Sequence, residues 1–166
     1  MKISLHKIDV AERQINQAIK MFFRKDEIIS IHTICTSGYQ ILSDICKKKK
    51  IYRQLEDNDI LRKLGIVQEV VKSLRKPQNY FKHACKDDNS EINFNTDITE
   101  VIIYLAIDLF EKITGTMSNE FKIFCGWFLL KYPNVRNPEM SKAFLKLTSL
   151  PNPNDFEFFK SMIKNG

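Results

Sequence analysis

Glycine and proline are scarce in this chain of 166 residues, at five each. Elastic, collagen-like and disordered proteins are rich in one or both residues, so these architectures are disfavoured. The hydrophobic fraction is 43% and includes twelve phenylalanines, which is enough to build a sizeable core. Length and composition together predict a single helical domain over residues 1–166 that folds without a partner.

Motifs that hold phosphates or metals are also missing. The chain has no GxGxxG or GxxxxGK loop, no His-Glu-x-x-His helix and no Glu-x-x-His pair of the di-iron helical bundles. The four cysteines, Cys35, Cys46, Cys85 and Cys125, form no CxxC pair and lack the nearby histidines of a zinc site. We therefore predict no metal, no cofactor and reduced thiols.

Long apolar runs are absent as well. The most apolar windows, residues 101–110 and 121–130, are about half the length that spans a bilayer, and each contains a charged residue. The N-terminus lacks the apolar stretch of a secretory signal. These features predict a cytoplasmic protein without a membrane partner.

The net charge of +6 is compatible with an acidic partner such as RNA. Basic residues are nevertheless scattered along the chain, and the only run is Lys47–Lys50. Two interpretations of this run stay open. It is either a solvated helix end, where cations meet the negative end of the helix dipole, or a nucleic-acid contact.

Apolar residues recur every three or four positions along most of the chain, which is the period of one helix face. Five main helices are predicted, and we describe each by its limits. The first begins at Asp9, with Glu12 as capping partner, and the second runs through Ile31–Ile45 into the lysine run. The third runs through Ile60–Leu74 after a cap at Asp57 or Asn58. The fourth extends from Thr96 or Asp97, with Glu100 as capping partner, to Gly115, and the fifth extends from Ser118 to a point before Pro133.

Two short helices are predicted to close the chain, because Asn137-Pro138 and Asn152-Pro153 each place a capping residue before a proline at the first helical position. The predicted fold class is all-α, a compact antiparallel helical bundle with its core over about residues 9–132 and the short helices over about 137–164. The fourth main helix is apolar on nearly all sides, which predicts that it is central.

Irregular positions in this pattern carry their own expectations. Pro77 predicts a kink or restart, with Gln78–Ala84 as a short helical turn. Ile92 and Phe94 alternate with polar residues, which indicates a short extended segment laid over the bundle. Gly38 lies inside a helix, where it predicts a close helix contact.

Candidate functional side chains gather after Pro77. His83 follows Asn79 by one helical turn, with Lys82 and Lys86 on the neighbouring surface, so an imidazole, an amide and cations could together meet a phosphate. The alternative is that Asn79 and His83 fasten this turn to the fold by hydrogen bonds. His32 lies at the edge of an apolar stripe, which favours a buried, hydrogen-bonded histidine over a binding residue.

Several blocks carry a resemblance to known sequences. Ser30–Thr33, Gly38–Asp44 and Asn79–Ala84, followed by Glu91–Asn95, resemble a family of uncharacterised bacterial proteins with IHT and N-[FY]-FKHA blocks. The resemblance covers roughly residues 9–133. It implies a bacterial cytosolic protein and no particular activity, and it makes the Phe-Lys-His-Ala block and His32 the natural focus of a shared site.

The chain also resembles HEPN domains, the helical bundles of toxin and antiviral ribonucleases, which pair an arginine with a histidine several residues later. Here Arg75 and His83 are further apart, and Pro77 lies between them. The resemblance implies that Arg75 stabilises a phosphate and that His83, beside Asn79, assists attack by the 2′-hydroxyl in metal-independent RNA cleavage.

Two hypotheses for function follow. The first is a helical-bundle protein that acts by binding, as a homodimer if an exposed apolar helix face pairs two copies. The second is a HEPN-like metal-independent ribonuclease or toxin–antitoxin component with Arg75, Asn79 and His83 as catalytic residues and Lys82, His32 and Lys86 as binding residues. The first hypothesis is favoured because the sequence contains no complete set of catalytic residues.

An RNA cleavage assay separates the two hypotheses. The binding hypothesis predicts that neither the purified protein nor His83→Ala cleaves a mixed RNA pool in EDTA, because the sequence contains no complete set of catalytic residues. Cleavage by the wild type that His83→Ala abolishes would instead establish the ribonuclease.

Overall fold

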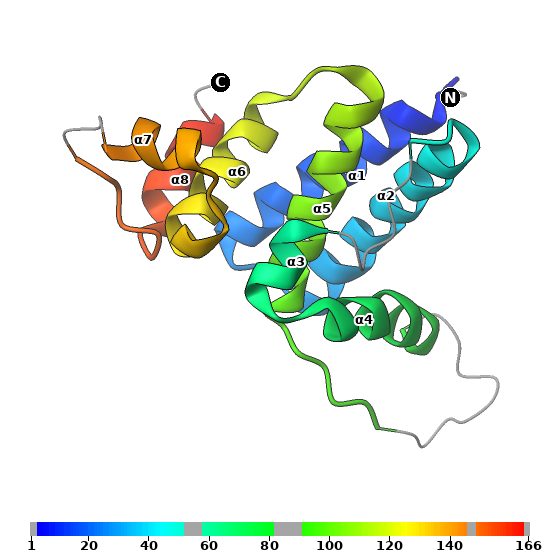
Figure 1. The fold of residues 1–166 in the computed structure, drawn as a ribbon. Coiled ribbons are helices and arrows are strands. Elements are labelled where there is room, and N and C mark those ends of the chain that lie inside the picture. Colours follow the sequence, from blue (N-terminus) through cyan, green and yellow to red (C-terminus); the bar gives the residue numbers. More distant parts are fainter. Residues whose placement is uncertain (1–2, 52–57, 82–90, 146–148, 165–166) are drawn as a thin grey trace.

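The computed structural model describes residues 3–51, 58–81, 91–145 and 149–164, and it is helical without a strand in those ranges (Figure 1). The all-α prediction is confirmed. The helices are α1 (Lys7–Arg24), α2 (Ile28–Lys48), α3 (Asp59–Leu64), α4 (Val67–Tyr80), α5 (Ile98–Thr114), α6 (Asn119–Lys131), η2 (Pro133–Val135), α7 (Pro138–Leu145) and α8 (Phe156–Lys164).

Helices α1 and α2 form an antiparallel pair joined by a short turn. The turn begins at Lys25, which adopts a left-handed conformation with φ 59° and ends α1, and Glu27 caps α2 by accepting a hydrogen bond from the amide of Ile29. The predicted apolar stripe of α1 is buried. The helix begins at Lys7, two residues before the predicted start, and Asp9 lies in its first turn.

Close contact between α1 and α2 occurs at Gly38, as predicted. A methyl group on this residue would lie 3.0 Å from Cγ1 of Ile15 and 3.2 Å from the carbonyl oxygen of Ala11. Both neighbours belong to α1, and the second is backbone, which has little freedom to move. An added methyl group would therefore push the neighbouring atoms of α1 by a few tenths of an ångström, so the two helices approach most closely where the residue is glycine.

Helix α5 is central, as predicted, with most of its residues buried, and it packs against α1, α2, α4 and α6. The first turns of α2 and α5 meet where His32 contacts Thr99, and near their last turns Lys112 of α5 acts electrostatically on Cys46 of α2. These two helices therefore run in the same direction, whereas α1 runs opposite to α2.

The third predicted helix is divided, and the break lies at Gly65 rather than at Pro77. Asn58 caps α3 as predicted, because its Oδ1 accepts hydrogen bonds from the amides of Ile60 and Leu61. Gly65 then adopts φ 69° and ends α3 in a left-handed cap. The backbone of α4 continues past Pro77 to Tyr80, so the helix does not restart at that proline.

An aromatic cluster joins α1, α6 and α8, which lie together in Figure 1. Phe22 contacts Trp127 at a ring distance of 4.8 Å and Phe156 at 5.4 Å, and Phe23 stacks on Phe159 at 5.5 Å. Trp127 is fully buried, and its Nε1 donates a hydrogen bond to the carbonyl oxygen of Pro153 at 2.8 Å. This cluster fastens the C-terminal helix to the bundle.

One of the two predicted C-terminal helix starts is confirmed. Helix α7 begins at Pro138 as expected, but α8 begins at Phe156 and not at Pro153. Asn152 accepts a hydrogen bond from the amide of Asn154 at 2.9 Å, which closes a turn, and Asp155 caps α8 through the amide of Phe158. The asparagine therefore makes an Asx turn instead of a helix cap.

Two other expectations concern the surface. The residues of the Lys47–Lys50 run are exposed at the end of α2, which is compatible with both interpretations of the run. Within the described ranges, no helix combines the length and apolar content needed to cross a bilayer.

The segment 91–95 is irregular, and Phe94 packs on His32 and Phe81 over the bundle, as expected.

The two helical glycines with no positive φ provide a stability test. Gly38→Ala should lower the free energy of unfolding by about 0–2 kcal/mol, because overpacking costs about 1–3 kcal/mol and better helix propensity offsets about 1 kcal/mol. Gly126→Ala is the matched control, since nothing lies within 4 Å of its added methyl group, and it should stabilise by about 0.5–1 kcal/mol. Urea unfolding measures both, and equal effects would contradict the close contact.

Candidate functional site

His32 is enclosed where α2, α5 and the 91–95 segment meet. Its side chain is fully buried, its Nδ1 lies 3.1 Å from Oγ1 of Thr99, and its ring lies 4.7 Å from the ring of Phe94. Phe81 contributes a second edge-on ring at 6.2 Å. The prediction of a buried, hydrogen-bonded histidine is confirmed, and in this conformation the imidazole does not face solvent.

The other predicted site residues fall in or after α4. Arg75 and Asn79 lie on the backbone of α4, four residues apart, and the structure does not describe their side chains. Lys82, His83 and Lys86 lie outside the described residues. The structure therefore places only His32 of the predicted set, and the hypothesis of a shared site with His83 stays a prediction.

Cysteine chemistry is suppressed by burial. Cys35 and Cys46 are buried and Cys125 is half-buried, and none of the three forms a disulfide. Burial raises the pKa of Cys125 to about 12 and raises the pKa of Cys35 further, so both thiols stay protonated at neutral pH. Cys85 lies outside the described residues. Among the described side chains, no group of three His, Cys, Asp or Glu is placed to hold a metal.

A buried carboxylate links α5 to the end of α6. Glu100, expected as a capping residue, instead accepts hydrogen bonds from Nζ of Lys131 at 2.6 and 2.8 Å and from the hydroxyl of Tyr132 at 3.0 Å. The ammonium of Lys131 also lies 5.4 Å from the ring of Trp127. Because every one of these groups is occupied by another, the network is a structural link between helices.

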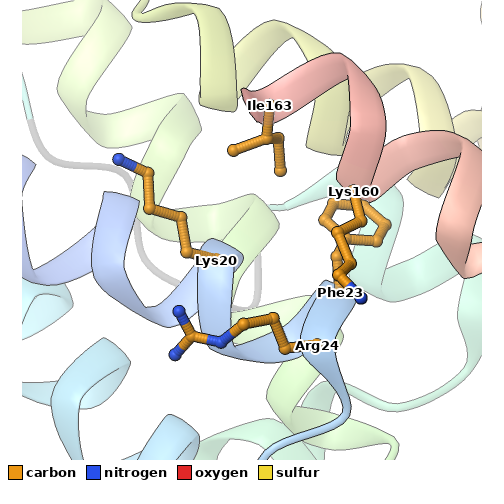
Figure 2. A pocket seen from close by; sticks show the side chains of 5 residues that line it. All are labelled: Lys20, Phe23, Arg24, Lys160 and Ile163. Carbon is orange, nitrogen blue, oxygen red and sulfur yellow. The ribbon is translucent and has the colours of Figure 1, made fainter. Parts of the chain in front are cut away.

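A pocket of about 220 Å³ lies between α1 and α8. Lys20, Phe23 and Arg24 of α1 line one side, and Lys160 and Ile163 of α8 line the other. In Figure 2, Ile163 and Arg24 lie on opposite sides of the space, with Lys20 on one flank and Phe23 and Lys160 on the other. The pocket therefore combines three cationic side chains with an aromatic ring and an aliphatic side chain.

Each cation of the pocket has a carboxylate partner. Lys20 pairs with Glu120 of α6 at 2.8 Å, and Lys160 pairs with Glu157 at 2.9 Å. Nε of Arg24 donates to Oδ2 of Asp26 at 3.1 Å. The three side chains are 42%, 28% and 45% exposed for Lys20, Lys160 and Arg24, so solvent and solutes reach them.

Sequence reasoning missed this pocket. Lys20 and Arg24 are spaced by one helical turn beside the predicted apolar stripe, which alone is typical of an ordinary solvated helix edge. Lys160 and Ile163 are distant in sequence and gave no sign of where α8 would dock. The packing of α8 on α1, through Phe159 on Phe23 and Phe156 on Phe22, brings the two sets together.

Comparison with known proteins finds no match: no family model, no curated protein and no solved structure is significantly similar to this chain.

The buried carboxylate generates a pH prediction. Burial raises the pKa of Glu100, and the hydrogen bonds from Lys131 and Tyr132 only partly oppose this effect. The folded state therefore holds this proton more tightly than the unfolded chain, where the pKa of glutamate is about 4.3. The resulting stabilisation is complete below that value and is lost as the pH rises through the folded-state pKa.

Glu100→Gln removes this titration. We expect the free energy of unfolding of the wild type, minus that of Glu100→Gln, to fall as the pH rises from about 4 to 7. Urea unfolding across that range provides the measurement. A difference that increases with pH would show that Lys131 outweighs burial.

Proposed function

We propose that this protein acts by binding, and that it binds a small organic anion with an apolar body in the pocket between α1 and α8. The observation that carries the proposal is the joint presence of Lys20, Arg24 and Lys160 around a space also lined by Phe23 and Ile163. Ligand pockets usually combine apolar walls with a few polar groups that fix orientation. Here the polar groups that line the space are all cationic, so an anion can bind them in exchange for their carboxylate partners.

The volume limits the size of the ligand. Pockets for drug-sized molecules measure about 300–1,000 Å³, whereas this one measures about 220 Å³. A single aromatic or short aliphatic carboxylate is of suitable size. Such a molecule of about nine non-hydrogen atoms binds weakly, with a dissociation constant of roughly 0.1–1 mM.

The chemistry of the walls favours an amphiphilic anion over a fully hydrated one. Lysine and arginine side chains cover apolar surface with their methylene stems and keep their charged ends in water. The stems of Lys20, Arg24 and Lys160 thus extend the apolar surface of Phe23 and Ile163. An apolar body gains from burial there while its carboxylate stays near the cations.

The other hypotheses concern different parts of the molecule. The ribonuclease hypothesis depends on Arg75, Asn79 and His83, which belong to a different part of the sequence from α1 and α8. The homodimer hypothesis needs an exposed apolar helix face, and Phe158 and Met162 of α8, each more than 40% exposed, would be part of such a face. Both hypotheses stay predictions that the binding experiments below do not test.

A titration of the ¹⁵N-labelled protein with benzoate tests the proposal. Amide signals of α1 and α8 should shift and saturate with a dissociation constant of roughly 0.1–1 mM. Benzyl alcohol has a similar body without the charge and should bind at least about tenfold more weakly, because it gains no charge-assisted contact. Equal binding of the two molecules, or no saturable shift in α1 and α8, would rule out an anion site.

A variant of the pocket supplies an independent check. Lys20→Gln should weaken benzoate binding by about two- to fivefold, since it removes one partly exposed charge-assisted contact. Lys72→Gln, on the exposed surface of α4, removes the same charge away from the pocket and should change the affinity by less than about 1.5-fold. The same titration measures both variants, and equal losses would indicate a general charge effect.

A further inference from the structure

We propose that the protein's own carboxylates occupy the cations of the α1–α8 pocket as internal counterions that a ligand must displace, and that Glu120 sets the affinity. This inference rests on the proposed anion binding and adds how the site selects its ligand. It starts from the three ion pairs of the pocket, in which the formal charges cancel.

The pair formed by Lys20 and Glu120 is the most protected of the three. The side chain of Glu120 is only 18% exposed, and it comes from α6, so the contact joins two helices that are distant in sequence. Partial burial raises the pKa of Glu120 and the hydrogen bond from Lys20 lowers it, with a net lowering. Glu120 is therefore ionised at neutral pH and neutralises Lys20 in the absence of a ligand.

The other two pairs are local and more exposed. Asp26 follows Arg24 by two residues, with a side chain that is 33% exposed, and Glu157 precedes Lys160 by three residues on α8 and is 79% exposed. Exposed ion pairs shift an equilibrium by about fivefold or less, because water competes with both partners. Competition with the ligand should consequently decrease from Glu120 to Asp26 and then to Glu157.

A ligand can take the place of Glu120 beside Lys20 because the carboxylate of Glu120 stays in a favourable electrostatic environment after Lys20 moves away from it. Glu120 lies in the first turn of α6, where the positive end of the helix dipole stabilises a negative charge. Lys20 is the more exposed partner and its long side chain can turn toward the ligand. The exchange thus replaces one ion pair by another, and the helix dipole stabilises the charge of Glu120 once Lys20 has moved away.

This exchange explains which ligands the pocket should prefer. A neutral molecule cannot replace a carboxylate, and a hydrated anion such as inorganic phosphate exchanges one ion pair for another with no additional gain. An anion with an apolar body also buries that body against Phe23 and Ile163. The ligand class is therefore an amphiphilic carboxylate, selected by competition with the internal counterions.

The test compares benzoate affinity in the wild type, Glu120→Gln, Asp26→Asn and Glu157→Gln by the same amide titration. We expect Glu120→Gln to bind about two- to fivefold more tightly, Asp26→Asn to gain less and Glu157→Gln to gain less than about 1.5-fold. Glu12→Gln is the matched control: it lies on α1 about 12 Å along the helix from Lys20 and removes the same charge outside the pocket.

Inorganic phosphate and benzyl alcohol are titrated into the same variants. Phosphate should bind more weakly than benzoate to every variant, and benzyl alcohol should gain nothing from Glu120→Gln. Wild-type binding that Glu120→Gln leaves unchanged, or that Glu12→Gln improves equally, would overturn the counterion inference while leaving the proposed function intact. Failure of benzoate to bind any variant would overturn both.

Discussion

Helix α1 packs against α2 so closely at Gly38 that an added methyl group would press on the backbone of α1. This contact places the apolar stripe of α1 between α2 and α5 and leaves its last turns, with Phe22 and Phe23, directed at α6 and α8. Because a helix is rigid over this length, the distance between α1 and α2 determines where those two phenylalanines lie. The pocket depends on the same contact, since three of its side chains belong to α1.

The aromatic cluster transmits this placement to the C-terminal helix. Phe156 and Phe159 of α8 pack on Phe22 and Phe23, and Trp127 holds the preceding turn through the carbonyl oxygen of Pro153. Ring packing thereby determines that Lys160 and Ile163 face Lys20 and Arg24. The pocket is a consequence of this docking, because none of the helices forms a concave surface alone.

Polar groups in the molecule follow two different rules. His32 and Glu100 are buried, and each contacts a partner on another helix or the adjoining turn, Thr99 for the histidine and Lys131 and Tyr132 for the carboxylate. Such contacts specify how the helices meet. The cations of the pocket are exposed and paired only with carboxylates that water can reach, so exchange with a ligand is possible there and not in the interior.

The sequence by itself determined the helical class, most of the apolar stripes, the caps at Asn58 and Ser118 and the close contact at Gly38, because these depend on local periodicity and on single side chains. It misjudged Pro77, Asn152 and Glu100, where neighbouring backbone or a distant helix decided the outcome. Only the tertiary structure decided that α2 and α5 run in the same direction and that Lys160 reaches the cations of α1. These features arise from contacts between residues far apart in the chain, on which helical periodicity carries no information.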